Sequence, residues 1–417
     1  MCNKQVLILI INKMSYFPKV RDIARARESL NKIMGYTMIQ QNLDMSKKYN
    51  SNIFLKREDL TPVRSYKIRG AYNKISSLDR SSKLTTASAG NHAQGVAFSG
   101  NLLSMQNNIF MPKITPKQKI DKVIKFGGQY TKIHLEGNNF DECSKIANEF
   151  MKSNNSEYIH PFNDSLVIEG QGTVGYEILN QLSNIDYIIL PIGGGGLASG
   201  LSACIKQVNS KIKIIGVEPM GAPSMKESIK QNRIVTLDKI DTFVDGAAVK
   251  RVGELNFNIC KETLDDIILI DEGHVCSKIL EVYNQHSFIF EPAGVLSLCA
   301  LDVLQPEIKN KNVVCIISGG NSDVFRMTEI LERSLIYEGL KHYFKIQFPQ
   351  KAGALKEFIL NVLGKDDDII YFKYEKVINK GLGPVILGIE LKDKKDIHQI
   401  INKMNKYDIL YEKVKLN

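Results

Sequence analysis

The sequence predicts an α/β protein in which two doubly wound α/β subdomains precede a smaller ferredoxin-like unit. Between about residues 50 and 335, apolar runs rich in β-branched residues alternate with amphipathic segments, as expected for parallel strands covered by helices on both faces. Glycine-rich turns follow several of these runs. After about residue 336 the order becomes strand, helix, strand, strand, helix, strand, which is the βαββαβ order of ferredoxin-like folds.

The first α/β subdomain is expected between residues 53 and 151. Its strands are predicted at 53–56, 85–88, 108–111 and 130–135. Its helices are predicted at 66–76, from residue 91, at 116–126, where Pro116 suits a first turn, and at 140–151.

The second α/β subdomain contains further apolar runs. Strands are predicted at 187–191, 213–218 and 313–317, and a helix is predicted from Leu197. Ligands of doubly wound sheets bind at the carboxyl ends of the strands, so the turns after these strands are candidate sites.

The ferredoxin-like unit sets the predicted domain division, with residues 1–335 in one domain and 336–417 in the other. Its strands are predicted at 342–348, 369–377, 385–391 and 409–414, and its helices at 352–363 and 396–405. The apolar run at 6–11 is expected to form a strand or an irregular extension. It is much shorter than a membrane-spanning helix and lacks the cleavage site of a signal peptide.

Composition favours a globular protein of two or three domains that keeps its thiols reduced. The 417 residues carry a net charge of +10, but no basic run is interleaved with aromatic residues, so nucleic-acid binding is not expected. The seven cysteines are spread singly without a C-x-x-C pair, which favours the cytoplasm over an oxidising compartment. The histidines show no zinc-binding spacing, and no metal site is predicted.

Four segments carry the chemical signal: residues 65–71, 88–92, 193–197 and 318–321. The first contains Lys67, an amine that could form a Schiff base if burial keeps it partly neutral. The third is a run of four glycines between an apolar strand and a helix, where backbone N–H groups and the helix dipole could hold a phosphate. It has neither the Walker lysine nor a G-x-G-x-x-G pattern.

Each of these segments also has a simpler interpretation. Most lysines are solvated surface charges, and glycine runs are often flexible turns. Asn91 could be the N-cap of the helix that follows it. Ser318 could be an ordinary serine in a turn.

On these segments the chain resembles the pyridoxal-phosphate (PLP) enzymes of fold type II, which are similar to the tryptophan synthase β chain, and among them threonine dehydratase (threonine ammonia-lyase). Residues 216–219 and 291–294 also match, and residues 243–254 resemble the biosynthetic rather than the catabolic enzymes. The resemblance covers about residues 25–415. The C-terminal unit is similar to a single ACT-like regulatory domain, with residues 350–355 matching its first strand-to-helix loop.

The resemblance implies a role for each candidate site residue. Lys67 is expected to bind PLP as a Schiff base and to act as the catalytic base, Asn91 to contact the ring hydroxyl, and Ser318 to face the pyridine nitrogen. The remaining candidates are phosphate-binding (Gly193, Gly194, Gly195, Gly196 and Leu197) or substrate-binding (Ser88, Ala89, Gly90 and His92).

The implied activity is that of a carbon–nitrogen lyase that converts L-threonine to 2-oxobutanoate and ammonia, with L-serine as a secondary substrate. This reaction is the first step of isoleucine biosynthesis. The resemblance further implies allosteric inhibition by isoleucine, opposed by valine, and a homo-oligomer, with a homotetramer favoured. No membrane association is expected.

The chain departs from the family in two places. Tyr36, Thr37 and Met38 stand where relatives carry Thr-Pro-Leu. Some relatives bind a divalent cation at positions equivalent to Glu218, Ala222 and Ser224, where Ser224 lacks the final carboxylate.

Three alternatives compete with this interpretation. A catabolic serine/threonine dehydratase or a serine racemase would share the fold, but residues 243–254 and the C-terminal unit argue against both. A non-enzymatic amino-acid sensor would not need the combination of Lys67, Asn91, the glycine run and Ser318. A dinucleotide-binding dehydrogenase would need an acidic residue after its glycine motif, and that residue is missing.

Overall fold

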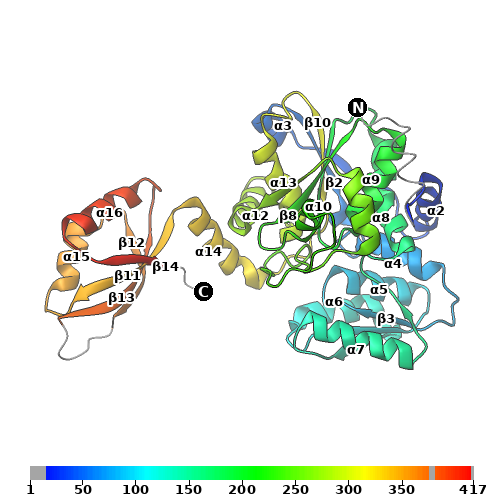
Figure 1. Ribbon diagram of the computed structural model, residues 1–417, viewed down its shortest axis with the longest axis horizontal. Coiled ribbons are helices and arrows are strands. Elements are labelled where there is room, and N and C mark those ends of the chain that lie inside the picture. Colours follow the sequence, from blue (N-terminus) through cyan, green and yellow to red (C-terminus); the bar gives the residue numbers. More distant parts are fainter. Residues whose placement is uncertain (1–15, 375–380, 415–417) are drawn as a thin grey trace. The chain divides into compact units, whose positions relative to one another are not determined.

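Two mostly parallel sheets and one antiparallel sheet organise the chain (Figure 1). The computed structural model describes residues 16–374 and 381–414, so the run at 6–11 and the end of the strand expected at 369–377 lie outside the described residues. The contacts divide the chain into a first unit that ends at Asp323 and a second that begins at Val324. The predicted α/β fold class is confirmed.

The division lies before the expected boundary at residue 335 because helix α14 (Met327–Glu338) packs within the second unit. Glu332 of this helix accepts a hydrogen bond from Tyr343 at 2.5 Å and pairs with Lys341. Both partners lie on the first strand of the second unit, so α14 is joined to that strand by side-chain contacts.

The large sheet of the first unit has the strand order β1-β2-β10-β7-β8-β9, and only β1 runs antiparallel to its neighbour. Its strands are β1 (Ile39–Gln41), β2 (Asn52–Arg57), β7 (Tyr187–Pro191), β8 (Lys213–Pro219), β9 (Asp266–Ile270) and β10 (Asn312–Ile317). β2 and β10 are adjacent although they are far apart in sequence, which brings the beginning and the end of the first unit together.

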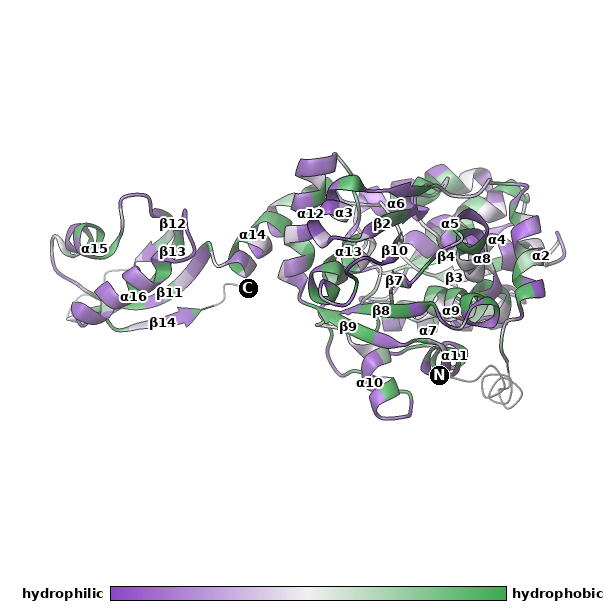
Figure 2. Cartoon of the chain, turned by 90° about the horizontal axis from the view of Figure 1, so that it is seen from above, coloured by the Kyte–Doolittle hydropathy of each residue, from purple (hydrophilic) through white to green (hydrophobic). Residues whose placement is uncertain are grey.

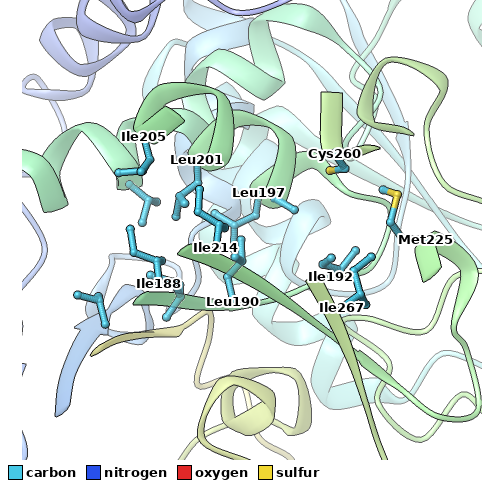
Figure 3. Packing of buried hydrophobic residues seen from close by; sticks show 14 of the residues in the cluster. Ile188, Leu190, Ile192, Leu197, Leu201, Ile205, Ile214, Met225, Cys260 and Ile267 are labelled. Carbon is cyan, nitrogen blue, oxygen red and sulfur yellow. The ribbon is translucent and has the colours of Figure 1, made fainter. Parts of the chain in front are cut away.

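The core of the large sheet lies between β7 and helix α9 (Gly196–Val208), as Figure 3 shows. Ile188 and Leu190 point from β7 toward Leu197 and Leu201, and all four side chains are buried. Full burial of such a side chain stabilises the fold by roughly 1.5–3 kcal/mol. On β10, the Cys315 thiol reaches the Ser297 carbonyl of helix α13 (Pro292–Leu304) at 3.8 Å, so α13 also covers this sheet.

The small sheet is parallel throughout, with the order β5-β4-β3-β6. Its strands are β3 (Leu84–Ala87), β4 (Asn107–Met111), β5 (Thr131–Leu135) and β6 (Glu157–Tyr158), and its helices are α5 (Asn91–Leu102), α6 (Lys117–Gly127) and α7 (Phe140–Ser153). Alternate strand residues enter two separate clusters. Leu84 and Ile109 pack with α5, whereas Ala87 and Phe110 pack with α7. The helices therefore cover both faces, as predicted.

Helix α8 (Ser165–Gln181) was not recognised in the sequence, and it holds together the helices that carry the predicted site. It crosses α4 (Lys67–Ser76) where a Cβ on Gly70 would lie 2.8 Å from the Val167 carbonyl oxygen. It crosses α9 where a Cβ on Gly200 would lie 2.2 Å from the Ile168 carbonyl oxygen. Only glycine permits such close approach of two helices.

The other elements of the first unit surround these two sheets. They are α2 (Val20–Leu30), α3 (Leu43–Tyr49), η1 (Glu58–Leu60), η2 (Gly128–Tyr130), α10 (Ser224–Lys230), α11 (Glu254–Thr263) and α12 (Glu272–His286). In Figure 2 many of the outer helices carry both polar and apolar residues, as expected for helices with one buried face. Across the described part of the chain, no helix combines the length and the apolar character needed to cross a membrane.

The second unit forms a four-stranded antiparallel sheet with the order β12-β13-β11-β14, which confirms the predicted ferredoxin-like arrangement. After η3 (Val324–Arg326) and α14, its elements are β11 (Lys341–Pro349), α15 (Ala354–Val362), β12 (Asp368–Tyr374), β13 (Leu382–Glu390), α16 (Asp396–Lys406) and β14 (Tyr411–Val414). Phe344 and Ile346 of β11 pack with Phe358 of α15 and Met404 of α16 in one buried cluster. The second unit thus has its own core.

Candidate active site

The segments that contain Lys67 and Ser318 lie side by side. The Tyr66 N–H donates to the Ser318 carbonyl at 3.1 Å, and Ser65 forms an antiparallel bridge with Gly319. Ser318 follows the carboxyl end of β10 and is almost fully buried. The structure therefore places these two predicted site residues at the same end of the large sheet.

Lys67 is the first residue of α4 and is not a solvated surface lysine. Its Nζ donates a hydrogen bond to the Pro161 carbonyl at 2.9 Å. Burial lowers the pKa of Lys67 to about 8, although the negative charge of Glu291 acts in the opposite direction. A sizeable fraction of this amine is thus neutral near pH 8, where an ordinary lysine is almost fully protonated.

The glycine run joins the carboxyl end of β7 to the start of α9. Gly195 has a φ of +93°, which favours glycine. A Cβ on Gly194 would lie 2.3 Å from the Phe162 ring, and a Cβ on Gly193 would lie 3.1 Å from the Cα of Ala247. The loop is confined by its neighbours rather than flexible. Since the first N–H groups of a helix have no partner within it, this turn presents free donors.

Asn91 lies in a group of polar side chains from three parts of the chain. Its Nδ2 donates to Glu291 Oε1 at 2.7 Å, and its Oδ1 accepts from Asn321 Nδ2 at 2.7 Å. Burial raises the pKa of Glu291 to about 7, while the hydrogen bond from Asn91 lowers it. The sequence analysis gave no role to Glu291 or Asn321. Both belong to segments that match the family, but nothing in those segments indicates that their side chains meet Asn91.

The loop at 88–92 begins α5, and Asn91 is the first helical residue rather than the N-cap. The Ser88 hydroxyl accepts hydrogen bonds from the Gly90 and Ala93 N–H groups, both at 3.3 Å, so Ser88 satisfies donors at this helix start. Ala89 and Gly90 are half-buried in the same turn. The His92 ring is buried, and Nε2 lies 2.8 Å from the Ile159 carbonyl oxygen. Burial and the nearby Lys67 lower the pKa of His92 to about 3, so it is neutral at physiological pH.

Glu218, the first of the three positions compared with a cation site in the sequence, is fully buried on β8. Its carboxylate accepts hydrogen bonds from the Met225 and Lys226 N–H groups at 2.7 and 2.9 Å. Burial raises the pKa of Glu218 to about 8. Within residues 16–374 and 381–414, no three His, Cys, Asp or Glu side chains are grouped so that they could hold a metal ion.

A buried ionic network lies behind Lys67. Arg69, two residues further along α4, contacts Glu58 and Glu177, each through an ion pair of 2.7 Å. Lys56 pairs with Glu177 at 2.7 Å, and the Thr37 hydroxyl donates to Glu58 at 2.6 Å. Thr37 belongs to the segment that departs from the family, and it is held firmly here. The network joins α4, α8 and β2, so it belongs to the scaffold that positions Lys67.

Comparison with known proteins agrees with this arrangement. Residues 30–319 match the family described as pyridoxal-phosphate dependent enzyme, and residues 332–417 match the C-terminal regulatory domain of threonine dehydratase. The biosynthetic L-threonine dehydratase IlvA of Halalkalibacterium halodurans is 50% identical over 96% of this chain and 97% of its own length. The chain belongs to the PLP-dependent threonine dehydratase family. The Bacillus subtilis relative of the same name is 48% identical over 95% of both chains.

Solved structures show the same fold as this threonine dehydratase family member. The processed form of threonine deaminase isoform 2 from Solanum lycopersicum has a TM-score of 0.72 and 37% identity, over 79% of this chain and 94% of that chain. Maize serine racemase has a TM-score of 0.71 and 28% identity, over 77% of this chain and 99% of that chain. The fold type II assignment and the expectation of a PLP-dependent enzyme are thus confirmed.

The residues present in this threonine dehydratase fit PLP. A partly neutral, part-buried amine at Lys67 suits covalent attachment of an aldehyde. The confined glycine turn at the start of α9 suits a phosphate, because side chains are absent there and the helix dipole favours an anion. The polar groups at Asn91 and Ser318 suit the edge of an aromatic ring with oxygen and nitrogen substituents.

Proposed function

We propose that this chain converts L-threonine to 2-oxobutanoate and ammonia, as the first step of isoleucine biosynthesis, with L-serine as a secondary substrate. The observation that carries the proposal is the 50% identity, over almost the full length of both chains, to a biosynthetic L-threonine dehydratase. The regulatory domain at residues 332–417 supports the biosynthetic branch over the catabolic one.

In this proposal each residue of the site has a separate role. Lys67 would hold PLP through its Nζ, and the same Nζ, when neutral, would take the proton from the substrate Cα. PLP, when bound, supplies a conjugated ring that accepts the negative charge developing at Cα. The N–H groups from Gly193 to Leu197 hold the phosphate. Asn91 contacts the ring hydroxyl, and Ser318 faces the pyridine nitrogen.

The loop from Ser88 to His92 takes the substrate carboxylate in this proposal. The turn that precedes α5 offers backbone donors, and His92 contributes no positive charge because it is neutral. Ser318 offers a hydroxyl rather than a carboxylate at the position expected for the pyridine nitrogen, so it would not hold a proton on that nitrogen as an acidic side chain would.

The substrate assignment is tested by comparing the release of 2-oxoacids from L-threonine and L-serine, together with the formation of D-serine from L-serine. We expect a higher kcat/KM for L-threonine and no racemisation. A preference for L-serine would move the chain to the catabolic branch. Accumulation of D-serine would favour the racemase alternative, which shares the fold.

We further propose that isoleucine binds to the second unit and inhibits the enzyme, with valine opposing it. A cavity in this unit has apolar walls from Phe348, Phe358, Val362 and Ile409 and polar groups from Glu357 and Asn361. This combination suits a branched amino acid, whose side chain is apolar and whose backbone groups are charged. Inhibition from this cavity requires coupling to the catalytic site of the first unit.

Deletion of residues 324–417 should remove inhibition by isoleucine while leaving threonine deamination by the first unit, since that unit has its own core. A milder test is Asn361→Leu, which should raise the isoleucine concentration needed for half-inhibition by roughly 2- to 10-fold, the effect of one lost hydrogen bond. Asn405→Leu is the matched control, because Asn405 is equally exposed but does not line the cavity. If the truncated enzyme is still inhibited, the effector site lies elsewhere.

Gly194→Ala should weaken PLP binding by the apoenzyme. The new Cβ would lie 2.3 Å from the Phe162 ring and would displace the phosphate-binding turn. Overpacking of this kind typically costs about 1–3 kcal/mol, or roughly 5- to 150-fold in affinity. Titration of the apoenzymes with PLP measures the change. Gly35→Ala is the control, since nothing lies within 4 Å of its Cβ, and equal affinities of the two variants would refute the role of the turn.

We propose that the chain forms a homo-oligomer, with a homotetramer favoured, in the cytoplasm. At the start of the second unit, the side chains of Val324 and Phe325 are 73% and 83% exposed, which suits a surface that another copy would cover. The six described cysteines are buried, and Cys143, Cys204, Cys260, Cys299 and Cys315 carry no disulfide, which suits a reducing compartment. Light scattering of the purified protein gives the number of copies.

A further inference from the structure

Three side chains form one directed series of hydrogen bonds beside Lys67. Asn321 Nδ2 donates to the Val63 carbonyl at 2.9 Å and to Asn91 Oδ1 at 2.7 Å. Asn91 Nδ2 then donates to Glu291 Oε1 at 2.7 Å, and the Asn321 N–H donates to Glu291 Oε2 at 3.3 Å. The series connects the turn after β10, the start of α5 and the start of α13.

The chemistry at each end determines the direction of this series. The Val63 carbonyl can only accept, so the amide of Asn321 must present its nitrogen on that side. Asn91 must therefore present its oxygen to Asn321 and its nitrogen to Glu291. When it is ionised, the Glu291 carboxylate can only accept, so in that state it imposes the same orientation from the other end. Rotation of the Asn91 amide by 180° would break its hydrogen bonds to Asn321 and Glu291. Its nitrogen would then face the Asn321 nitrogen, and its oxygen would face the Glu291 carboxylate.

The surrounding backbone is shaped to admit the Glu291 carboxylate. A Cβ on Gly319 would lie 2.3 Å from Glu291 Oε1, and a Cβ on Gly246 would lie 3.6 Å from the same atom. The Glu291 N–H also donates to the Gly319 carbonyl at 3.3 Å. The carboxylate therefore occupies space that Gly319 leaves open, and any larger residue at Gly319 would displace it, whereas a Cβ at Gly246 would only touch it.

We propose that Glu291 and Asn321 are positioning residues that orient the Asn91 amide, leaving its second N–H free to donate to the ring oxygen of bound PLP. The inference rests on the proposed function, in which Asn91 contacts the ring hydroxyl. An amide nitrogen carries two hydrogens, and Glu291 takes only one of them. Without Asn321 and Glu291, the Asn91 amide could rotate and present its Oδ1, instead of its N–H, to the ring oxygen of PLP. Two oxygens that both accept cannot form a hydrogen bond with each other.

A double-mutant cycle on PLP affinity tests the proposal without using the substrate. Asn91→Ala, Asn321→Ala and the double variant are prepared as apoenzymes and titrated with PLP, following the visible absorption band of the bound cofactor. We expect each single variant to bind PLP roughly 2- to 10-fold more weakly, the effect of one hydrogen bond. The double variant should bind no more weakly than Asn91→Ala, because Asn321 acts through Asn91. If the loss of PLP affinity in the double variant equals the product of the losses in the two single variants, the two residues act independently and the proposal is wrong.

The isosteric variant Asn321→Asp tests the direction of the series. Its carboxylate cannot donate to Val63 or Asn91, and it would draw the Asn91 nitrogen away from Glu291. We expect it to bind PLP more weakly than Asn321→Ala does, although it preserves the side-chain volume. Equal or tighter binding would show that donor direction is irrelevant and would refute the inference.

Two further variants complete the test. Asn107→Ala removes a more deeply buried amide on β4, which donates to Thr131 at 3.1 Å, and it should leave PLP affinity unchanged. Glu291→Ala should lower the affinity for PLP as Asn321→Ala does. An unchanged affinity for PLP would show that Glu291 does not orient Asn91. The proposed function is tested independently of these variants: it is wrong if the unaltered holoenzyme forms no 2-oxobutanoate from L-threonine.

Discussion

Lys67→Ala should abolish the formation of 2-oxobutanoate from L-threonine. In the proposed mechanism, the substitution removes both the amine that would hold PLP and the base that would take the Cα proton. Loss of a general base alone typically reduces the rate by about 10²–10⁴-fold, and loss of covalent attachment adds to this. Steady-state kcat, measured with excess PLP, gives the size of the effect.

The matched control for this variant is Lys74→Ala, on the same helix α4. Lys74 forms a half-buried ion pair with Asp164 at 3.0 Å and has no role in the proposed reaction. Its substitution should leave kcat within a factor of about two, because it removes no group that transfers a proton. If Lys67→Ala keeps the activity of this control, the assignment of Lys67 is wrong.

Arg69→Ala should lower the free energy of unfolding by about 3–5 kcal/mol, which is the effect of removing one partner from a buried ion pair. Arg69 is fully buried and makes paired hydrogen bonds of 2.7–2.9 Å to both Glu58 and Glu177. Without it, Glu177 retains Lys56 and Arg27, but Glu58 retains only the Thr37 hydroxyl among the described side chains. Urea unfolding followed by circular dichroism measures the change.

Arg21→Ala provides the comparison, because the Arg21 side chain is 69% exposed and its ion pair with Asp22 spans 3.5 Å. We expect that variant to change the stability by less than about 1 kcal/mol. Equal stability losses in the two variants would contradict a structural role for the buried network.

The pH dependence of unfolding gives a second readout of this network. Burial alone would raise the pKa of Glu177, but Arg69 and Lys56 together lower it from 4.5 to about 2. An acid with a lowered folded-state pKa stabilises the protein above its unfolded pKa and loses this effect as the pH falls. The stabilisation from Glu177 should therefore disappear between about pH 4.5 and 2, and Arg69→Ala should reduce this dependence.

Most strands and several helices of both units could be predicted because their signals are local. The run at 187–191 is β7, the helix predicted at 116–126 is α6, and the alternation at 342–348 lies within β11. Helix α8 gave no such signal, because Gly170 and Gly172 are poor helix formers in isolation. Their presence is explained only by the close crossing with α4 and α9, which depends on the tertiary structure.

The candidate site was predictable as a set of segments but not as a set of contacts. Lys67, the glycine run and Ser318 could be selected because each follows or begins a recognisable element. The partnership of Asn91 with Glu291 and Asn321 joins positions that are far apart in sequence, so no local pattern reports it. For the same reason the sequence suggested Asn91 as a helix cap, whereas Ser88 accepts the hydrogen bonds at that helix start.

The most direct test of the account is to identify the lysine that carries PLP. Reduction of the holoenzyme with borohydride makes the link between PLP and its lysine permanent, and peptide mapping by mass spectrometry then locates it. We predict that the pyridoxyl group is found on the peptide that contains Lys67 and on no other. Its recovery on a different lysine, or on none, would contradict the site built around Lys67, the glycine run and Ser318.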